Sequence, residues 1–226
     1  MHIPDGFLDP PIFAATYAFA LVFILLAFRG TRRSLGDRQL PLLSILTASV
    51  FAAQMLNFPI IGGTSGHLVG GTLIAVFLGP YAAIFSMTVI LVIQALVFGD
   101  GGLTALGANL LNMGVIAAGT YYVYVGLRRL MSGERGAVAA VFAAAWLSVF
   151  LGALACGLEI GVSSAFQPVG GVAVTVPLMG FWHVFIGVGE AAITSAIYAY
   201  VSKTRPEILS LPKIGPLGGV PFGEMG

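Results

Sequence analysis

Long stretches without any charged side chain constrain this chain most strongly. No Asp, Glu, Lys or Arg occurs from Gln39 to Gly99, and none occurs from Gly136 to Leu158. A spanning helix needs roughly 20 apolar residues to cross a hydrocarbon core about 30 Å thick. Lipid admits only helices and closed barrels, because every backbone polar group must be satisfied internally, and these runs lack the alternation of barrel strands. The sequence therefore predicts an all-α integral membrane protein.

The composition excludes the common soluble classes of protein. Of the 226 residues, 58% are hydrophobic and only 8% are charged, whereas a soluble domain is about 25% charged. A soluble enzyme, a nucleic-acid binder and a disordered regulator are therefore excluded, and the lipid bilayer is the expected environment. The single cysteine, Cys156, permits neither an intrachain disulfide nor a cysteine-based metal cluster.

The apolar stretches predict seven transmembrane helices, one of them short. The run from Leu68 to Phe98 is too long for one span, because 31 helical residues would reach roughly 46 Å. We expect Gly79-Pro80 to divide it into a short helix and a full one. The predicted helices cover residues 10–28, 40–57, 67–78, 81–98, 106–127, 136–160 and 178–202.

The basic residues predict the orientation of these helices. All ten Lys and Arg fall within residues 29–38, 128–135 and 203–213, and short basic loops stay in the cytoplasm. Seven spans place all three clusters inside only when the N-terminus is outside and the C-terminus is cytoplasmic. Residues 1–205 are then expected to form one transmembrane domain, and the Pro/Gly-rich residues 206–226 a cytoplasmic tail, either loose or docked on a partner.

The first two residues form a potential metal chelate. The chain begins Met-His-Ile-Pro-Asp-Gly-Phe-Leu-Asp, with no basic stretch of a signal peptide, so we expect Met1 to remain the N-terminus. The α-amine of Met1, the backbone nitrogen of His2 and the His2 imidazole can close fused rings on one cation. The backbone nitrogen must lose its proton, and planar nitrogen ligation of this kind favours nickel(II) or copper(II).

His67 is the expected fourth ligand. It follows the loop Gly62-Gly63-Thr64-Ser65-Gly66, at the external end of the short helix, on the same membrane side as Met1. The N-terminal segment could therefore insert toward His67 inside the bundle. Metal-bound histidine needs a partner on its other ring nitrogen, and Thr64, Ser65 or an asparagine could provide one. The candidates that could orient the site include Asn57, Asn109, Asn112 and Gln54.

Three sequence blocks resemble a known family. They are Met-His-Ile-Pro-Asp-Gly-Phe-Leu at the start, residues 62–71 (GGTSGHLVGG) followed by Gly79-Pro80, and residues 107–114 (GANLLNMG). Together they resemble the CbiM/NikM family, the substrate-binding components of energy-coupling factor transporters for nickel and cobalt in prokaryotic cell membranes. The resemblance covers the whole hydrophobic region. It implies seven helices, an N-terminus inserted into the bundle, and Met1, His2 and His67 as metal ligands.

The resemblance also implies partners and a cargo. The energy would come from a transmembrane coupling protein with two ATP-binding subunits, and a small accessory membrane subunit is expected. The chain itself has no phosphate-binding P-loop motif. Ala48 and Ala52, four apart on the second helix, are the expected docking face. The cargo would be Ni²⁺ or Co²⁺, carried as a transported ion, with no cofactor and no enzymatic activity. Four nitrogens in a plane favour Ni²⁺, although Co²⁺ can also be bound by such donors.

A second function also fits the sequence. His183 and Glu190 are seven residues apart on the last helix, hence on one face, and Glu159 lies on the helix before it. Ionisable side chains at membrane depth are candidate functional groups. A self-contained, proton-coupled carrier of a small solute could use His183 and Glu190 as a relay, although hydrogen bonding between helices would also account for them.

Overall fold

The computed structural model describes residues 1–60 and 64–216, most of which are helical. Two π-helical turns cover Gln94–Phe98 and Leu111–Val115, and Ser164–Val169 forms a 3-10 turn. Strands β1 (Phe58–Ile60) and β2 (Thr64–Gly66) pair in antiparallel register, with Pro59 opposite Ser65. The helices are α1 (Pro10–Ser34), α2 (Gln39–Gln54), α3 (Gly71–Leu78), α4 (Pro80–Ile93), α5 (Leu106–Leu110), α6 (Ile116–Leu130), α7 (Gly133–Val162), α8 (Val172–Thr204) and α9 (Pro206–Leu209).

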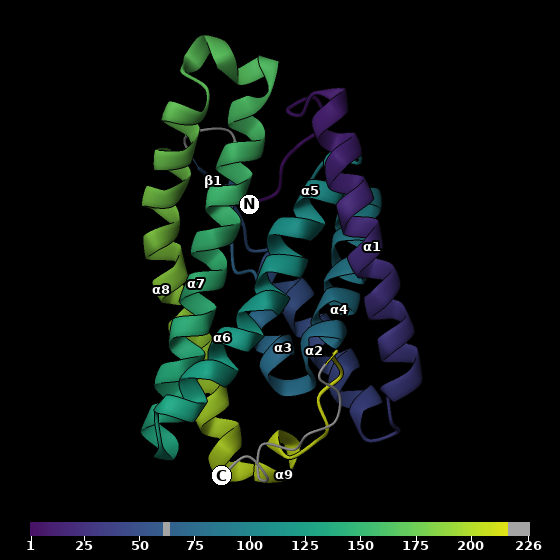
Figure 1. Cartoon of the computed structure of the whole chain (residues 1–226), viewed down its shortest axis with the longest axis vertical. Helices are drawn as coiled ribbons and strands as arrows, with labels where there is room; N and C mark the ends of the chain where they lie inside the picture. Colours follow the sequence, from purple (N-terminus) through teal and green to yellow (C-terminus); the bar gives the residue numbers. More distant parts are fainter. Residues whose placement is uncertain (61–63, 217–226) are drawn as a thin grey trace.

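Five of these helical segments are long and apolar enough to cross a membrane. They cover Pro10–Ser34, Pro80–Phe98, Leu106–Leu130, Gly133–Val162 and Val172–Thr204. Helix α2 is also apolar but has only 16 residues. In Figure 1 the two longest helices, α7 and α8, run side by side next to the group formed by α1 to α6. The prediction of a helical multi-pass membrane protein is confirmed.

The last helix begins earlier than the sequence predicts. Hydropathy places its start at Leu178, but α8 begins at Val172. The Thr175 hydroxyl donates to the carbonyl oxygen of Gly157 on α7 at 2.6 Å. This bond fixes the additional turns against the neighbouring helix, and Pro177 lies within them.

Helix α3 is a half-length helix at the centre of the bundle. All eight of its residues are buried, and it packs against α2, α4, α6 and α7. The sequence prediction that this helix starts at His67 is wrong by four residues. Gly70 has φ +73°, and the Val69 and Gly70 N–H groups donate to the Glu190 side chain instead of facing a helix turn. The predicted break at Gly79-Pro80 is confirmed, because Gly79 has φ +99° and α4 begins at Pro80.

Part of the C-terminal tail donates hydrogen bonds to the last carbonyl groups of α3. The Ile214 N–H donates to the Leu78 carbonyl at 2.7 Å, and the Ile214 carbonyl accepts from the Tyr81 N–H at 2.9 Å. The buried Lys213 amine donates to the Phe77 carbonyl at 2.9 Å and to the Leu209 carbonyl at 3.0 Å. Through these bonds the described part of the tail, residues 206–216, packs against the chain's own bundle; residues 217–226 lie outside the described part.

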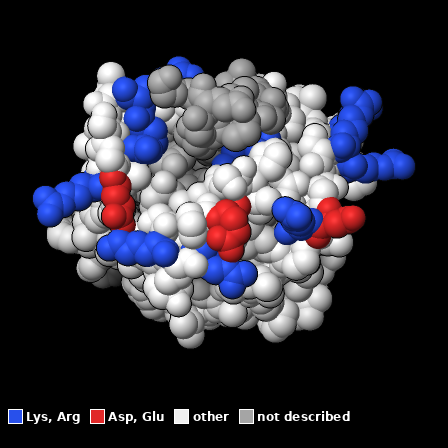
Figure 2. Space-filling view, turned by 90° about the horizontal axis from the view of Figure 1, so that it is seen from below, with Lys and Arg blue, Asp and Glu red and all other residues white. Residues whose placement is uncertain are grey.

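Basic side chains gather at the end of the bundle that holds this tail. The last turns of three helices carry Arg32 and Arg33, Arg128 and Arg129, and Lys203. Figure 2 shows Lys and Arg side chains around the rim of this lower end. The N-terminus lies inside the outline of the bundle, far from the end that carries the C-terminal segment (Figure 1).

The packing of the tail predicts the effect of Gly79→Ala. An added Cβ would clash with the backbone of Ile214, and the φ of +99° disfavours any L side chain. Losing the two Ile214 hydrogen bonds, each worth about 1 kcal/mol, is expected to speed trypsin cleavage after Lys213 by roughly tenfold or more. Digestion of the purified protein, followed by mass spectrometry, measures this rate.

Gly126→Ala is the matched control for this prediction. Gly126 lies in α6, and no atom beyond its chain neighbours and the nearby backbone of its own helix lies within 4 Å of the position that an added Cβ would take, so alanine there should leave the cleavage rate unchanged. Equal rates of trypsin cleavage after Lys213 in both variants would show that the contact between Gly79 and Ile214 does not hold the tail.

Candidate metal centre

The N-terminal segment enters the bundle and is buried there. Met1 is 1% exposed, His2 4% and Ile3 0%. The Asn109 side chain holds both backbone groups of Ile3, accepting from its N–H at 2.9 Å and donating to its carbonyl at 3.2 Å. The Gly102 N–H donates to the same carbonyl at 2.8 Å. These bonds satisfy an extended segment that would otherwise carry unpaired polar groups among apolar helices.

The Met1 amine lies against His67. Its nitrogen is 2.9 Å from the His67 Nε2 atom, and it also donates to the Ser65 carbonyl oxygen. The His67 Nδ1 atom is 2.6 Å from the Leu68 carbonyl oxygen. Because a carbonyl only accepts, Nδ1 carries the proton and Nε2 presents its lone pair to the amine. A square of nitrogen ligands with metal bonds of about 2.0 Å has edges of about 2.8 Å, close to this separation.

The His2 ring is held in the tautomer that the chelate needs. Its Nε2 atom is 3.1 Å from the Gln94 Oε1 atom, so Nε2 donates and Nδ1 carries the lone pair. In the described part of the chain Nδ1 has no hydrogen-bond partner; the Asp100 Oδ1 atom lies 3.3 Å away. The His2 and His67 rings stack with centroids 4.5 Å apart.

Burial keeps the three nitrogen groups neutral. Desolvation lowers the pKa of the Met1 amine to about 5 and that of the His2 ring to about 3. Desolvation also holds the pKa of His67 well below its usual value. At neutral pH all three groups therefore carry free lone pairs, which is the form that binds a metal ion. Desolvation raises the pKa of the Asp100 carboxyl, the acid beside His2.

The structure places two of the side chains that the sequence proposed around this site, Ser65 and Asn109, against the N-terminal segment. Ser65 and Asn109 contact the N-terminal segment directly: the His2 N–H lies 3.4 Å from the Ser65 hydroxyl, and Asn109 bonds Ile3. The Thr64 side chain, Gly62 and Gly63 lie outside the described residues. His67 lies between β2 and α3 rather than on a helix.

The other proposed polar residues act at a distance from the three nitrogen groups. Asn57 donates to Asp100 at 2.8 Å, and Asn112 donates to Glu159 at 2.6 Å. Gln54, on α2, donates to the Val69 carbonyl at 2.5 Å. These bonds position neighbours of the site rather than its ligands. Ala48 and Ala52 are exposed on the outer face of α2, away from the site.

Sequence reasoning missed Gln94 as a partner of His2. A buried amide in an apolar span is a signal in itself, because polar groups at membrane depth are retained for a role. Gln94 is fully buried in the π-helical turn that ends the fourth predicted span. The Ser65 backbone carbonyl was also missed, and no side-chain pattern could have indicated it.

His183 and Glu190 do not bond to each other. The His183 Nδ1 atom is 2.8 Å from the Met179 carbonyl, and both Glu190 oxygens accept backbone N–H groups. Within residues 1–60 and 64–216 no three His, Cys, Asp or Glu side chains cluster as metal ligands.

Comparisons with known proteins agree with a metal transport role. Residues 2–208 match the family model CbiM, described as the cobalt uptake substrate-specific transmembrane region. The chain is 43% identical over 210 residues to a putative fused nickel transport protein, NikMN, of Archaeoglobus fulgidus, covering 92% of this chain and 68% of that protein. It is 32% identical over 230 residues to the cobalt transport protein CbiM of Geobacter sulfurreducens, covering 97% and 64% respectively.

A solved structure has the same fold. The crystal structure of a transition metal transporter superposes with a TM-score of 0.82 at 35% sequence identity, covering 90% of this chain and 93% of that chain. The relatives are metal transport proteins and not enzymes.

The two hydrogen bonds between the Asn109 side chain and the Ile3 backbone predict the effect of Asn109→Ala. The variant leaves the buried Ile3 N–H without its acceptor, which costs about 1–3 kcal/mol and loosens the N-terminal segment. We expect the rate at which a water-soluble acylating reagent modifies the Met1 amine to rise by roughly tenfold, as measured by mass spectrometry of the N-terminal peptide.

Gln167→Ala serves as the control for this experiment. The Gln167 amide donates to the Gly161 carbonyl at 2.8 Å, so the variant removes a similar hydrogen bond elsewhere in the chain. Its amine labelling should match that of the wild-type protein. Labelling that is equally fast in all three proteins would mean that Asn109 does not hold the segment.

Proposed function

Because this chain belongs to the CbiM family of substrate-specific transmembrane regions for cobalt uptake, we propose that it captures Ni²⁺, in preference to Co²⁺, through Met1, His2 and His67. The chain is a multi-pass metal transport protein, so a transition-metal ion is its cargo. The alternative of a carrier for an organic solute that uses His183 and Glu190 is set aside, because the family transports metals.

One observation carries the proposal: the Met1 amine lies 2.9 Å from a His67 nitrogen that presents its lone pair. The His2 ring, in the tautomer with a free Nδ1, is stacked on His67. The His2 backbone nitrogen completes the set once a metal displaces its proton. Four nitrogens in one plane favour nickel(II) over cobalt(II), and copper(II) binds such donors more strongly still.

The surrounding groups fit such a site. Gln94 and the Leu68 carbonyl hold the remaining ring nitrogens of His2 and His67, which fixes ring orientation and raises ligand basicity. Ser65 and Asn109 hold the N-terminal segment, and Thr64 is retained as a proposed support. A divalent ion with one deprotonated amide keeps one positive charge, and the Asp100 carboxylate beside His2 lies where it can offset that charge.

The transport cycle requires partners. The chain would act as the substrate-specific component of an energy-coupling factor importer, with a coupling protein, two ATP-binding subunits and a small accessory membrane subunit. It would cross the membrane seven times, with the metal entering from outside and the basic end of the bundle in the cytoplasm (Figure 2). Residues 1–205 would form the metal-binding domain and residues 206–226 a cytoplasmic tail. Release inward would follow distortion of the plane or reprotonation of the His2 amide.

The ligand set predicts two losses of nickel binding. One residue placed ahead of Met1 displaces the amine, and His67→Ala removes the fourth nitrogen. Each change is expected to weaken binding by more than the roughly 10–100-fold typical of losing an outer partner, and to remove the absorption of planar low-spin nickel. Titration calorimetry and visible spectroscopy, on protein whose free Met1 amine is verified by mass, measure both effects.

Two control variants accompany this test. One residue added after Gly226 makes the same extension at the other end of the chain, and His183→Ala removes the third histidine. Both should retain the planar nickel spectrum. If the extended N-terminus and His67→Ala bound nickel as tightly as the wild-type protein, the proposed site would be wrong.

If Ala48 and Ala52 form the docking face, larger residues at these positions should weaken docking of the partner without affecting nickel binding. Leucine at both positions enlarges the outer face of α2, where small residues would let a partner helix approach closely. We expect ATP-driven nickel uptake by the assembled transporter to fall to about a tenth or less, while nickel binding by the isolated chain is unchanged. Leucine at Ala14 and Ala18, an exposed pair with the same spacing on α1, should leave uptake intact; loss of uptake in both pairs would remove the specific role of α2.

A further inference from the structure

The beginning of α3 poses an electrostatic problem for a metal site. The helix starts at Gly71, four residues after His67, and its whole first turn is buried. The first N–H groups of a helix have no partner within it, and they give this end a partial positive charge. This positive end lies close in sequence to His67, a proposed ligand of the ion. It therefore disfavours binding of the ion unless the positive charge of the helix end is offset.

Glu190 supplies that offset from another helix. Its Oε2 atom accepts from the Val69 N–H at 2.6 Å and its Oε1 atom from the Gly70 N–H at 2.7 Å. The Glu190 residue is 1% exposed. Both oxygens face N–H donors, and no basic side chain within residues 1–60 and 64–216 forms an ion pair with it. Short bonds of this kind are typical of a carboxylate that accepts from backbone N–H groups.

We propose that Glu190 is a positioning residue of the metal site, whose side chain reaches from α8, fixes the backbone of Val69 and Gly70, and so holds His67 where it completes the nickel plane. This inference rests on the proposed function of Met1, His2 and His67. Glu190 does not touch the metal, and it acts only through the segment 67–70.

The segment between His67 and α3 has little freedom once this bond is made. Gln54 on α2 donates to the Val69 carbonyl at 2.5 Å, so Val69 is held at both its N–H and its carbonyl. Gly70 adopts the left-handed conformation, with Val50 packed where a Cβ would be. The His67 ring donates to the Leu68 carbonyl at 2.6 Å. Fixing the backbone at Leu68 to Gly70 therefore fixes the direction of the His67 ring.

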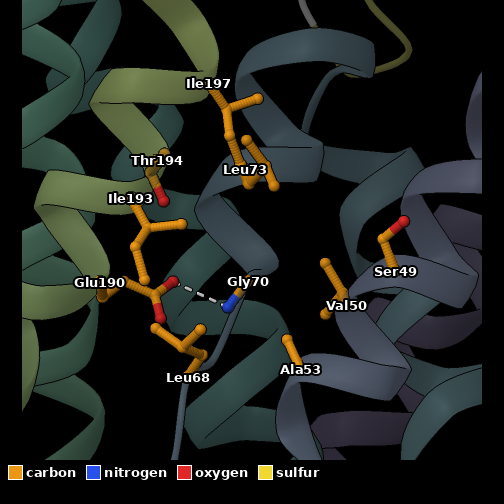
Figure 3. Close-up of a pocket in the computed structure, with 10 residues that line it drawn as sticks. All are labelled: Ser49, Val50, Ala53, Leu68, Gly70, Leu73, Glu190, Ile193, Thr194 and Ile197. Carbon is orange, nitrogen blue, oxygen red and sulfur yellow. Dashed lines mark hydrogen bonds between the residues drawn. The ribbon is translucent and has the colours of Figure 1, made fainter.

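The surroundings of Glu190 leave room for movement. A cavity of about 100 Å³ lies between α2 and α8 beside the Glu190–Gly70 bond, as Figure 3 shows. Its lining from α8 includes Ile193, Thr194 and Ile197, on the same side as Glu190. The Glu190 bonds thus connect α8 to the segment before α3 across a space that is not tightly packed.

A double-mutant comparison tests the proposal. In Glu190→Gln one acceptor oxygen becomes an NH₂ group that faces an N–H donor. We expect the nickel dissociation constant to rise about 10–100-fold, and the planar nickel absorption to weaken, because His67 no longer completes the plane. In a His67→Ala background, Glu190→Gln should change the constant by less than about threefold, since both changes remove the same contribution.

Two further variants keep the test decisive. Glu190→Asp retains the charge but is shorter by one methylene, so we expect an intermediate affinity and partial recovery of the planar spectrum; it also replaces the glutamine variant if that protein does not fold. Thr194 is a buried residue that lines the same cavity, and the Thr194→Val variant should bind nickel like the wild-type protein. All proteins are measured as monodisperse preparations with Ni²⁺ as the probe.

The outcomes separate this inference from the proposed function. Wild-type affinity and spectrum in both Glu190 variants, together with a strong loss in His67→Ala, would overturn the role of Glu190 alone. An equal loss from Glu190→Gln with and without His67 would show that Glu190 acts on overall stability instead. Unchanged binding in His67→Ala would overturn the metal site itself.

Discussion

The structure depends on satisfying the hydrogen-bonding groups at both ends of the buried helix α3. Helix α3 has no exposed residue, so neither its first N–H groups nor its last carbonyls can reach water. Glu190 accepts from the N–H groups just before the helix, and the Lys213 amine and Ile214 N–H donate to the carbonyls of Phe77 and Leu78 at its other end. The acid and the base lie at the helix ends that their charges favour.

The hydrogen bonds at the two ends of α3 link parts of the chain that are far apart in sequence. One end of α3 leads to His67 and the inserted N-terminus, and the other end leads to the tail. Helix α8 and residues 206–216 therefore contact opposite ends of the same helix. Helix α3 therefore lies between the segment that carries His67 and the tail at the basic end of the bundle.

The proposed metal centre is compatible with the apolar interior of the bundle. Charged ligands are costly to bury, and burial keeps the amine and imidazoles neutral until a metal arrives. Before a metal binds, Asn109 fixes the N-terminal segment through Ile3, and the Gln94 Oε1 atom and the Leu68 carbonyl oxygen accept hydrogen bonds that fix the tautomers of the His2 and His67 rings. A site built from the chain terminus needs few ionisable side chains, which agrees with the 8% charged composition.

Much of this could be predicted from sequence, and the remainder depends on tertiary contacts. Apolar runs and the Gly79-Pro80 pair predicted the helices and the break, and chelate chemistry singled out Met1, His2 and His67. Hydropathy could not indicate the β1–β2 hairpin, the start of α3 at Gly71 or the packing of Lys213, because each depends on partners distant in the chain. Helical periodicity placed Glu190 and His183 on one face, but it could not indicate that Glu190 holds Val69, 121 residues away.

X-ray absorption spectroscopy of the nickel-loaded chain, with its free Met1 amine verified, tests the central claim most directly. The account predicts a four-coordinate, planar nickel ion bound by nitrogen alone, with the scattering pattern of two imidazole rings. A six-coordinate ion with several oxygen ligands, or a single imidazole contribution, would contradict it.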